Sequence, residues 1–84
     1  MVTNPLNEVV NVNAFYFRSG RGLKSFPREI EVGNARHTFS DGLQYLVRHG
    51  QHVVRFFDMN DGRTTYRLRF EDDTWTLVGT RDMS

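Results

Sequence analysis

Three histidines are the side chains in this sequence best suited to catalysis or metal binding. His49 and His52 flank Gly50-Gln51, a spacing at which two imidazoles could hold one metal ion. A structural zinc site needs four protein ligands and a catalytic site needs three, and only His37 or a carboxylate could complete the set. We therefore expect no metal site, and we interpret His49 and His52 as ordinary surface residues.

Other catalytic or ion-binding signatures are excluded by their spacing. The segment from Asp58 to Gly62 resembles the start of a calcium loop, but Gly62 stands fifth rather than sixth and Arg69 is twelfth, where glutamate is needed. His37 is expected on the apolar side of its strand as a buried neutral histidine, since no nucleophile motif accompanies it. The sequence thus predicts no catalytic residue, no cofactor and no small-molecule substrate, so we expect a protein that is not an enzyme.

Arginine is the other chemically notable residue, because it supplies ten of the eleven basic side chains, against ten acidic ones. In the hairpin register predicted below, Arg55 lies across from Arg67, and Arg69 is one step away on the same sheet face. Like charges that face each other across strands destabilise a sheet by about 0.2–1 kcal/mol, so a neutralising partner is expected. The partner is either internal, namely Glu29 and Glu31 on a neighbouring strand, or external, namely a bound phosphate or carboxylate.

A second basic feature is the segment from residue 18 to residue 28, which has four positive charges and no acid. Its basic residues are Arg18, Arg21, Lys24 and Arg28. Glycines beside arginine, with Phe17 and Phe26 at the edges, suit backbone contact and base stacking in single-stranded nucleic acid. The alternative is a solvated loop between two strands.

The elements that position these residues must belong to one small domain. The chain has 84 residues, of which 38% are hydrophobic and 13% aromatic, and it has no cysteine. This length predicts a single domain over 1–84 with frayed ends at 1–7 and 81–84. The lack of cysteine excludes a disulfide-stapled scaffold and a cysteine-ligated zinc fold. No signal or membrane-spanning pattern is visible, so we expect a cytoplasmic protein without membrane contact.

Alternating apolar and polar residues predict strands in the first half of the chain. The first strand is expected from Glu8 to Phe17, followed by the basic loop. Two strands, Arg28 to Val32 and Ala35 to Phe39, then flank Gly33-Asn34, a two-residue turn in which glycine accepts a positive φ. The expected cross-strand pairs are Ile30 with His37, Glu31 with Arg36, and Val32 with Ala35.

Two further hairpins are predicted near the C-terminus. Asn60 to Gly62 fits a three-residue bulged turn, and Asp72-Asp73 fits a two-residue turn. The expected pairs are Phe56 with Tyr66, Val54 with Leu68, Phe70 with Trp75, Leu68 with Leu77, and Tyr66 with Gly79. A competing two-residue turn at Asp61-Gly62 would bring Arg55 to the core side, so we prefer the bulged version.

A single helix is predicted between these two groups of strands, from about Ser40 to His49. Ser40 is a suitable N-cap, and Gly50 can end the helix in the left-handed conformation. The buried stripe would consist of Leu43, Leu46 and Val47, at i, i+3 and i+4. Tyr45 then falls on the outer face of the helix.

Together these elements predict an α+β fold in the order βββ-α-βββ, with a twisted antiparallel sheet of five to six short strands or a small open barrel. For function, we expect a non-catalytic interaction module that binds a protein partner or a second copy of itself through exposed aromatics or a sheet edge. The candidate interface residues are Phe15, Phe17 and Tyr45. The alternative is single-stranded RNA or DNA binding through the arginine face and the basic loop.

Overall fold

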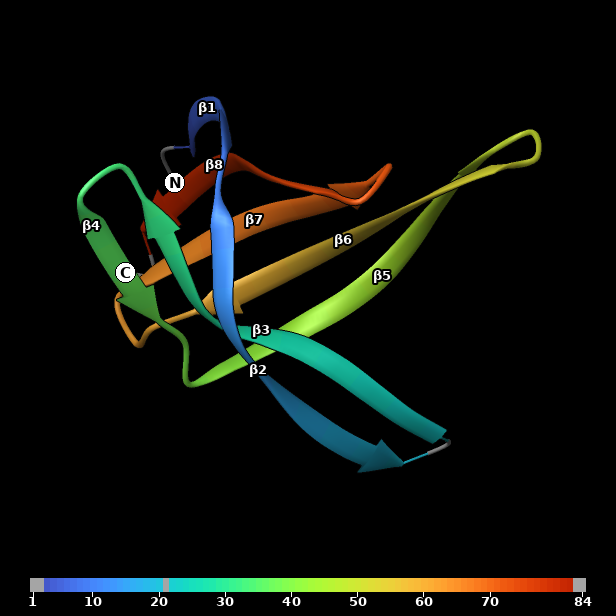
Figure 1. Ribbon diagram of the computed structural model, residues 1–84, viewed down its shortest axis with the longest axis horizontal. Helices are drawn as coiled ribbons and strands as arrows, with labels where there is room; N and C mark the ends of the chain where they lie inside the picture. The colour runs from blue at the N-terminus through green and yellow to red at the C-terminus, as the bar shows by residue number, and fades with distance from the viewer. Residues whose placement is uncertain (1–2, 21, 83–84) are drawn as a thin grey trace.

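The computed structural model describes residues 3–20 and 22–82, and its regular structure there is antiparallel β-strand throughout (Figure 1). The strands are β1 (Thr3–Val9), β2 (Asn11–Gly20), β3 (Gly22–Val32), β4 (Ala35–Thr38), β5 (Asp41–His49), β6 (His52–Asn60), β7 (Thr64–Glu71) and β8 (Thr74–Asp82). They form a five-stranded sheet in the order β1-β8-β7-β6-β5 and a three-stranded sheet in the order β2-β3-β4. The α+β prediction is therefore wrong, because the described part of the chain is all-β.

The hairpins of the two sheets share a common direction. In Figure 1 the tips of the β2/β3, β5/β6 and β7/β8 hairpins lie to the right, whereas the β3/β4 and β6/β7 turns lie to the left. The chain passes from the small sheet to the large one at Phe39 and Ser40, whose N–H groups donate to the carbonyls of Arg28 and Asn60, at 2.7 and 2.9 Å. The first bond continues the pairing of β3 with β4 and the second continues the pairing of β5 with β6, so the chain itself joins the two sheets at this point.

The core lies between the two sheets. Its most deeply buried side chains, at most 2% exposed, are Ile30, Phe39, Phe57, Met59 and Leu68. Phe26 of β3 meets Phe57 of β6 edge-on across the sheets, with ring centroids 6.3 Å apart. A close approach at Gly42 completes this packing, because a Cβ there would lie 2.3 Å from Sδ of Met59 and 3.0 Å from the carbonyl oxygen of Asp58.

The segment predicted as a helix, Ser40 to His49, is the edge strand β5, which pairs with β6 along all nine of its residues. The predicted stripe is not a buried one: Leu43 is 68% exposed and Leu46 is 59% exposed. An isolated helix of about ten residues is marginal in water, and Gly42 costs about 1 kcal/mol relative to alanine. Gly50 does adopt a positive φ of 60°, but it forms the β5/β6 turn rather than a helix cap.

Two of the predicted hairpin registers are confirmed. Ile30 pairs with His37 around Gly33, whose φ is 59°. Phe70 pairs with Trp75 around Asp72 and Asp73, which both have positive φ. The predicted pair of Leu68 with Leu77 is also present, but a register shift between Arg67 and Leu68 then sets Gly79 against Arg67 rather than Tyr66.

The predicted β6/β7 register is wrong. The last pair is Asn60 with Thr65, so four residues lie between the paired positions, and the carboxylate of Asp61 accepts two backbone N–H groups there, from Arg63 and Thr64, at 2.9 Å each. The longer connection sets Phe57 against Leu68 and Met59 against Tyr66, so the core side chains of β6 are Phe57 and Met59 rather than Val54 and Phe56. It also places Arg55 and Arg67 on different faces of the sheet.

The N-terminal half contains one strand more than predicted. The segment Glu8 to Phe17 is divided at Val10, which is buried and donates its N–H to the carbonyl of Trp75 at 3.0 Å. The residues on either side of Val10 belong to different sheets. The predicted basic loop is the β2/β3 hairpin, in which Arg18 pairs with Lys24. The two ends expected to fray are described from Thr3 and as far as Asp82, and there Thr3 pairs with Arg81.

Candidate interaction surfaces

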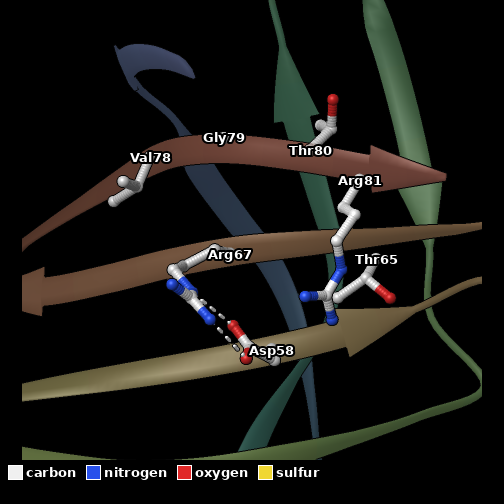
Figure 2. Close-up of a pocket in the computed structure, with 7 residues that line it drawn as sticks. All are labelled: Asp58, Thr65, Arg67, Val78, Gly79, Thr80 and Arg81. Carbon is white, nitrogen blue, oxygen red and sulfur yellow. Dashed lines mark hydrogen bonds and ion pairs between the residues drawn. The ribbon is translucent and has the colours of Figure 1, made fainter. Parts of the chain in front are cut away.

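The three arginines expected on one sheet face are divided between the two faces of the five-stranded sheet. Arg67 and Arg69 lie on the outer face, which points away from the core, and Arg55 lies on the inner face opposite Phe70. Arg67 faces Asp58 across the strands and donates to both its carboxylate oxygens, at 2.8 and 3.0 Å (Figure 2). Hydrogen bonding to Asp58 raises the pKa of the Arg67 guanidinium, which keeps it charged.

The outer arginines are neutralised from within their own sheet, by different residues from those expected. The Nε atom of Arg69 lies 3.5 Å from a carboxylate oxygen of Glu71. Glu29 instead lies 3.9 Å from Arg36, and Glu31 accepts a hydrogen bond from Asn13 at 3.5 Å. The sequence analysis missed Asp58 because the wrong hairpin length placed another residue opposite Arg67.

One described residue of the basic segment, Arg18, has an acidic partner within the molecule. Arg18 forms an ion pair with Asp41 of β5, and its guanidinium lies 5.0 Å from the centroid of the Phe26 ring. Arg28 lies over the Tyr16 ring at 5.7 Å, and Lys24 is the neighbour of Arg18 across the hairpin. Arg21 lies outside the described residues. The backbone N–H of Gly42, and then Arg18, lower the pKa of Asp41.

Two of the three histidines form separate hydrogen-bonded pairs, and His49 lies across the strands from His52. Nδ1 of His37, which is half-buried, lies 3.1 Å from the hydroxyl of Tyr66, and burial raises the pKa of that hydroxyl. Nε2 of His52 lies 2.6 Å from Glu71, and this hydrogen bond raises the pKa of His52. Residues 3–20 and 22–82 hold no cluster of three or more histidine or acidic side chains that could bind a metal ion.

The three predicted interface aromatics are exposed but do not share one surface. Phe15 is 45% exposed and its ring lies 6.0 Å from that of Trp75, on the inner side of the large sheet. Phe17 is 65% exposed on the same strand, β2. Tyr45 lies on the outer face of β5, where its ring stacks on Phe56 at 5.5 Å with an interplanar angle of 13°. Tyr45 is therefore the centre of a different surface.

This surface, which we call the β5–β6 patch, is made of apolar residues on the outer face of the two strands. They are Leu43, Tyr45, Val47, Val54 and Phe56. The guanidinium of Arg67 lies 5.8 Å from the Tyr45 ring and joins the patch to the ion pair with Asp58. Val54 is buried although it does not join the core cluster. The signal that could have located the patch is the alternation of Leu43, Tyr45 and Val47, which the helix prediction concealed.

A shallow pocket of about 140 Å³ lies beside the patch on the outer face. Figure 2 shows its lining residues, which are Asp58, Thr65, Arg67, Val78, Gly79, Thr80 and Arg81. Gly79, which is buried, lies opposite Arg67 and contributes only backbone to the lining. The pocket and the β5–β6 patch share the Arg67–Asp58 ion pair, so the outer face combines apolar and charged groups in one continuous region.

The β5/β6 hairpin carries part of the patch beyond the rest of the sheet. Pairing between β6 and β7 ends at Arg55 and Phe70, whereas β5 and β6 remain paired as far as His49 and His52. In Figure 1 this ribbon extends past β7 on the right. The hydrogen bond between His52 and Glu71 fastens it to the end of β7.

No known protein family, curated protein or solved structure matches the chain. Within the described ranges there is also no helix long and apolar enough to cross a membrane. The inferences about function below therefore rest on the geometry of the chain itself.

Proposed function

We propose that the protein is a non-catalytic interaction module that binds a protein, either a partner or a second copy of itself, through the β5–β6 patch. The observation that carries this proposal is the exposure of Leu43 and Tyr45, 68% and 36%, on a strand at the edge of its sheet. Contiguous apolar surface rimmed by charged groups is typical of protein-binding sites on small domains. A cytoplasmic setting and the absence of cofactor chemistry belong to the same proposal.

The chemistry of the patch supports a protein as the ligand. Tyrosine and arginine are enriched among the residues that dominate binding energy at protein interfaces. Here the Tyr45 ring is held between Phe56 and Arg67, and Arg67 is in turn held by Asp58. A side chain that is already ordered loses little conformational entropy when a partner covers it, which favours binding.

The alternative of single-stranded nucleic-acid binding has weaker support from the charges. Arg67 and Arg69 are paired with Asp58 and Glu71, and Arg18 is paired with Asp41. Each phosphate contact made by these arginines would have to displace a carboxylate, which reduces the gain from counterion release. The aromatic rings of the patch also lie beside a carboxylate, which phosphate groups would avoid.

A site-specific crosslink tests the proposed function. Tyr45 is replaced by the photoreactive amino acid p-benzoylphenylalanine, and the full chain is irradiated in cells of its source organism. The control carries the same group at Val9, which is 72% exposed on the opposite edge of the same sheet. We expect a discrete covalent adduct, with a second copy or with another protein, from position 45 and not from position 9.

The second arm of this test removes the patch without touching the core. Leu43→Asp places a charge at its apolar centre, where the native side chain is exposed, so the fold is expected to persist. The adduct at position 45 should then disappear, while Val9→Asp leaves it intact. Equal labelling from positions 45 and 9, or labelling that survives Leu43→Asp, contradicts the proposal.

A further inference from the structure

Four strands form the edges of the two sheets, and three of them are protected against pairing with another chain. β1 contains Pro5 and a register shift between Pro5 and Glu8. β4 has only four residues, and the pairing of β2 has two register shifts, between Val12 and Phe15. Short, bulged or proline-containing edges resist the addition of a further strand. The fourth edge, β5, has none of these features.

β5 is instead built as a template for pairing. Its nine residues are in continuous register with β6, and it contains neither proline nor lysine. Its apolar side chains are exposed on both faces, with Leu43 on the outer face and Leu46 on the inner. Its last three residues, Val47 to His49, lie in the two-stranded ribbon beyond Arg55, and two-stranded ribbons alone are only marginally stable in water. A further strand would cover both apolar faces at once.

The order of residues along β5 indicates what this strand would be. Its outer face reads Asp41, Leu43, Tyr45, Val47, His49, with an acid at one end and a histidine at the other. Reversing the strand about Tyr45 sets Asp41 across from His49, and Leu43 across from Val47, at both ends of the pair. On the inner face, Arg48 would meet Gly42, whose inner side is already covered by the side chain of Met59, so the complementarity lies on the outer face. The strand is therefore complementary to itself when antiparallel.

We propose that β5 pairs with β5 of a second copy, antiparallel and centred on Tyr45, so that two five-stranded sheets become one continuous sheet. This inference rests on the proposed function and names its partner. The pair is isologous, and such two-fold pairs are the commonest closed assembly. The pairing uses the β5 edge of both copies. The remaining edge of each large sheet is the protected β1, so assembly stops at two copies.

Charge and register exclude the competing arrangements of the same edge. Parallel pairing in register sets Asp41 against Asp41, and like charges directly opposite are unfavourable. An antiparallel pair shifted by two residues loses at least one of the two contacts between Asp41 and His49. Asp41 already forms an ion pair with Arg18 and accepts the N–H of Gly42, so His49 of the second copy would share this carboxylate with them.

The β2/β3 hairpin flanks the start of β5, where Arg18 and Lys24 line a shallow pocket together with Leu43, so the added strand would lie beside this hairpin. It reaches β5 through Gln44, which lies on the inner face and donates to the carbonyl of Ser25 at 2.9 Å. Within the described residues, the only strand that pairs with β5 is β6. Alternate N–H and C=O groups along the other side of β5 therefore point away from β6, toward an added strand.

Sedimentation equilibrium of the full chain over a wide concentration range tests the second copy. We expect the mass to rise from 9.8 kDa toward twice that value. His49→Asp sets acid against Asp41 and should weaken the dimer by at least tenfold in Kd, whereas His49→Lys restores opposite charge and keeps it. A chain that remains monomeric at the highest concentration, or a dimer unaffected by His49→Asp, overturns the inference.

A disulfide test locates the two-fold axis, and it is clean because the chain has no cysteine of its own. Residues opposite each other in an antiparallel pair have Cα atoms about 4.5–5.5 Å apart, within the range a disulfide spans. Under mild oxidation Tyr45→Cys should form a covalent dimer much faster than Val9→Cys. Equal rates, or faster linkage at position 9, place the contact elsewhere and refute β5 pairing.

These results also separate the inference from the proposed function on which it rests. A monomer that still gives the position-45 crosslink with a different protein refutes the second copy but preserves the patch as a binding surface. A monomer that gives no such crosslink refutes both. A dimer joined at position 45 and abolished by Leu43→Asp supports both.

Discussion

The two edges of the five-stranded sheet, β1 and β5, carry similar exposure but differ in backbone regularity. Val9 of β1 is 72% exposed, slightly more than Leu43 of β5 at 68%. β1, however, is interrupted between Pro5 and Glu8, where Asn7 adopts a positive φ of 55°. β5 is unbroken along nine residues. Exposure of an apolar side chain alone therefore does not distinguish the two edges, whereas the continuity of unpaired backbone groups does.

The difference extends to what lies behind each edge. β5 is backed by the stacked pair of Tyr45 and Phe56 and by the Arg67–Asp58 ion pair, so its exposed surface belongs to an ordered cluster. β1 packs against β8, whose residue opposite Pro5 is Gly79, which offers no side chain. One edge thus presents a pre-formed surface and the other presents an irregular end of the sheet.

The difference between the β1 and β5 edges can be tested at Gly42, where β5 packs close to the core. Gly42→Val would place carbon atoms against Sδ of Met59 and the carbonyl of Asp58, and overpacking of this kind costs about 1–3 kcal/mol. Urea unfolding should show that loss. Gly20→Val is the matched control, because nothing lies within 4 Å of a Cβ there. A gain in stability at position 42, as strand propensity alone predicts, would contradict the close packing of this edge.

A smaller effect is expected at Arg67, which supports the surface behind β5. Arg67→Met removes the two hydrogen bonds to Asp58 and the contact with the Tyr45 ring, and partly exposed pairs of this kind contribute about 0.5–1 kcal/mol. Arg69→Met, which loses only the longer contact with Glu71, is the control on the same face. If Arg67→Met and Arg69→Met lower the free energy of unfolding in urea equally, the contacts of Arg67 with Asp58 and Tyr45 do not order the surface behind β5.

Hairpin registers that are fixed by a few neighbouring residues could be predicted from the sequence, whereas registers that depend on more distant contacts could not. The turns at Gly33-Asn34 and Asp72-Asp73 were predicted with the correct pairs, because a two-residue turn fixes its register within a few residues. The β6/β7 register failed by a small shift, since the carboxylate of Asp61 stabilises a longer connection that the residue types alone do not distinguish.

The helix prediction failed for a different reason. Leu43, Leu46 and Val47 match both a helical stripe and a strand exposed on two faces, and only the long-range pairing with β6 decides between them. The candidate site was likewise predicted only in the part that one strand determines. Tyr45 was predicted as an interface residue, but its neighbours Phe56 and Arg67 come from other strands, so the patch could be assembled only once the registers were known.

The smallest predicted effect concerns pH and the far end of the β5 edge. The hydrogen bond with Glu71 raises the pKa of His52 in the folded protein. Its contribution to stability is therefore complete below the usual histidine pKa of about 6.5 and is lost as the pH rises through the elevated folded value. Amide protons exchange faster at higher pH in any peptide. Between pH 5.5 and pH 8 we expect exchange in the β5/β6 ribbon to accelerate by more than this intrinsic increase, and exchange along β1 to accelerate by the intrinsic increase alone.

An NMR titration of the His52 ring decides this point. Glu71→Gln removes the charged acceptor and should lower the His52 pKa toward its ordinary value, whereas Asp73→Asn changes net charge equally but leaves the hydrogen bond in place. Asparagine also tolerates the positive φ of 58° at position 73. If the two variants shift His52 alike, general charge rather than the Glu71 contact sets its pKa. The pH dependence of the β5 ribbon would then arise from the charges around His52 and not from this one contact.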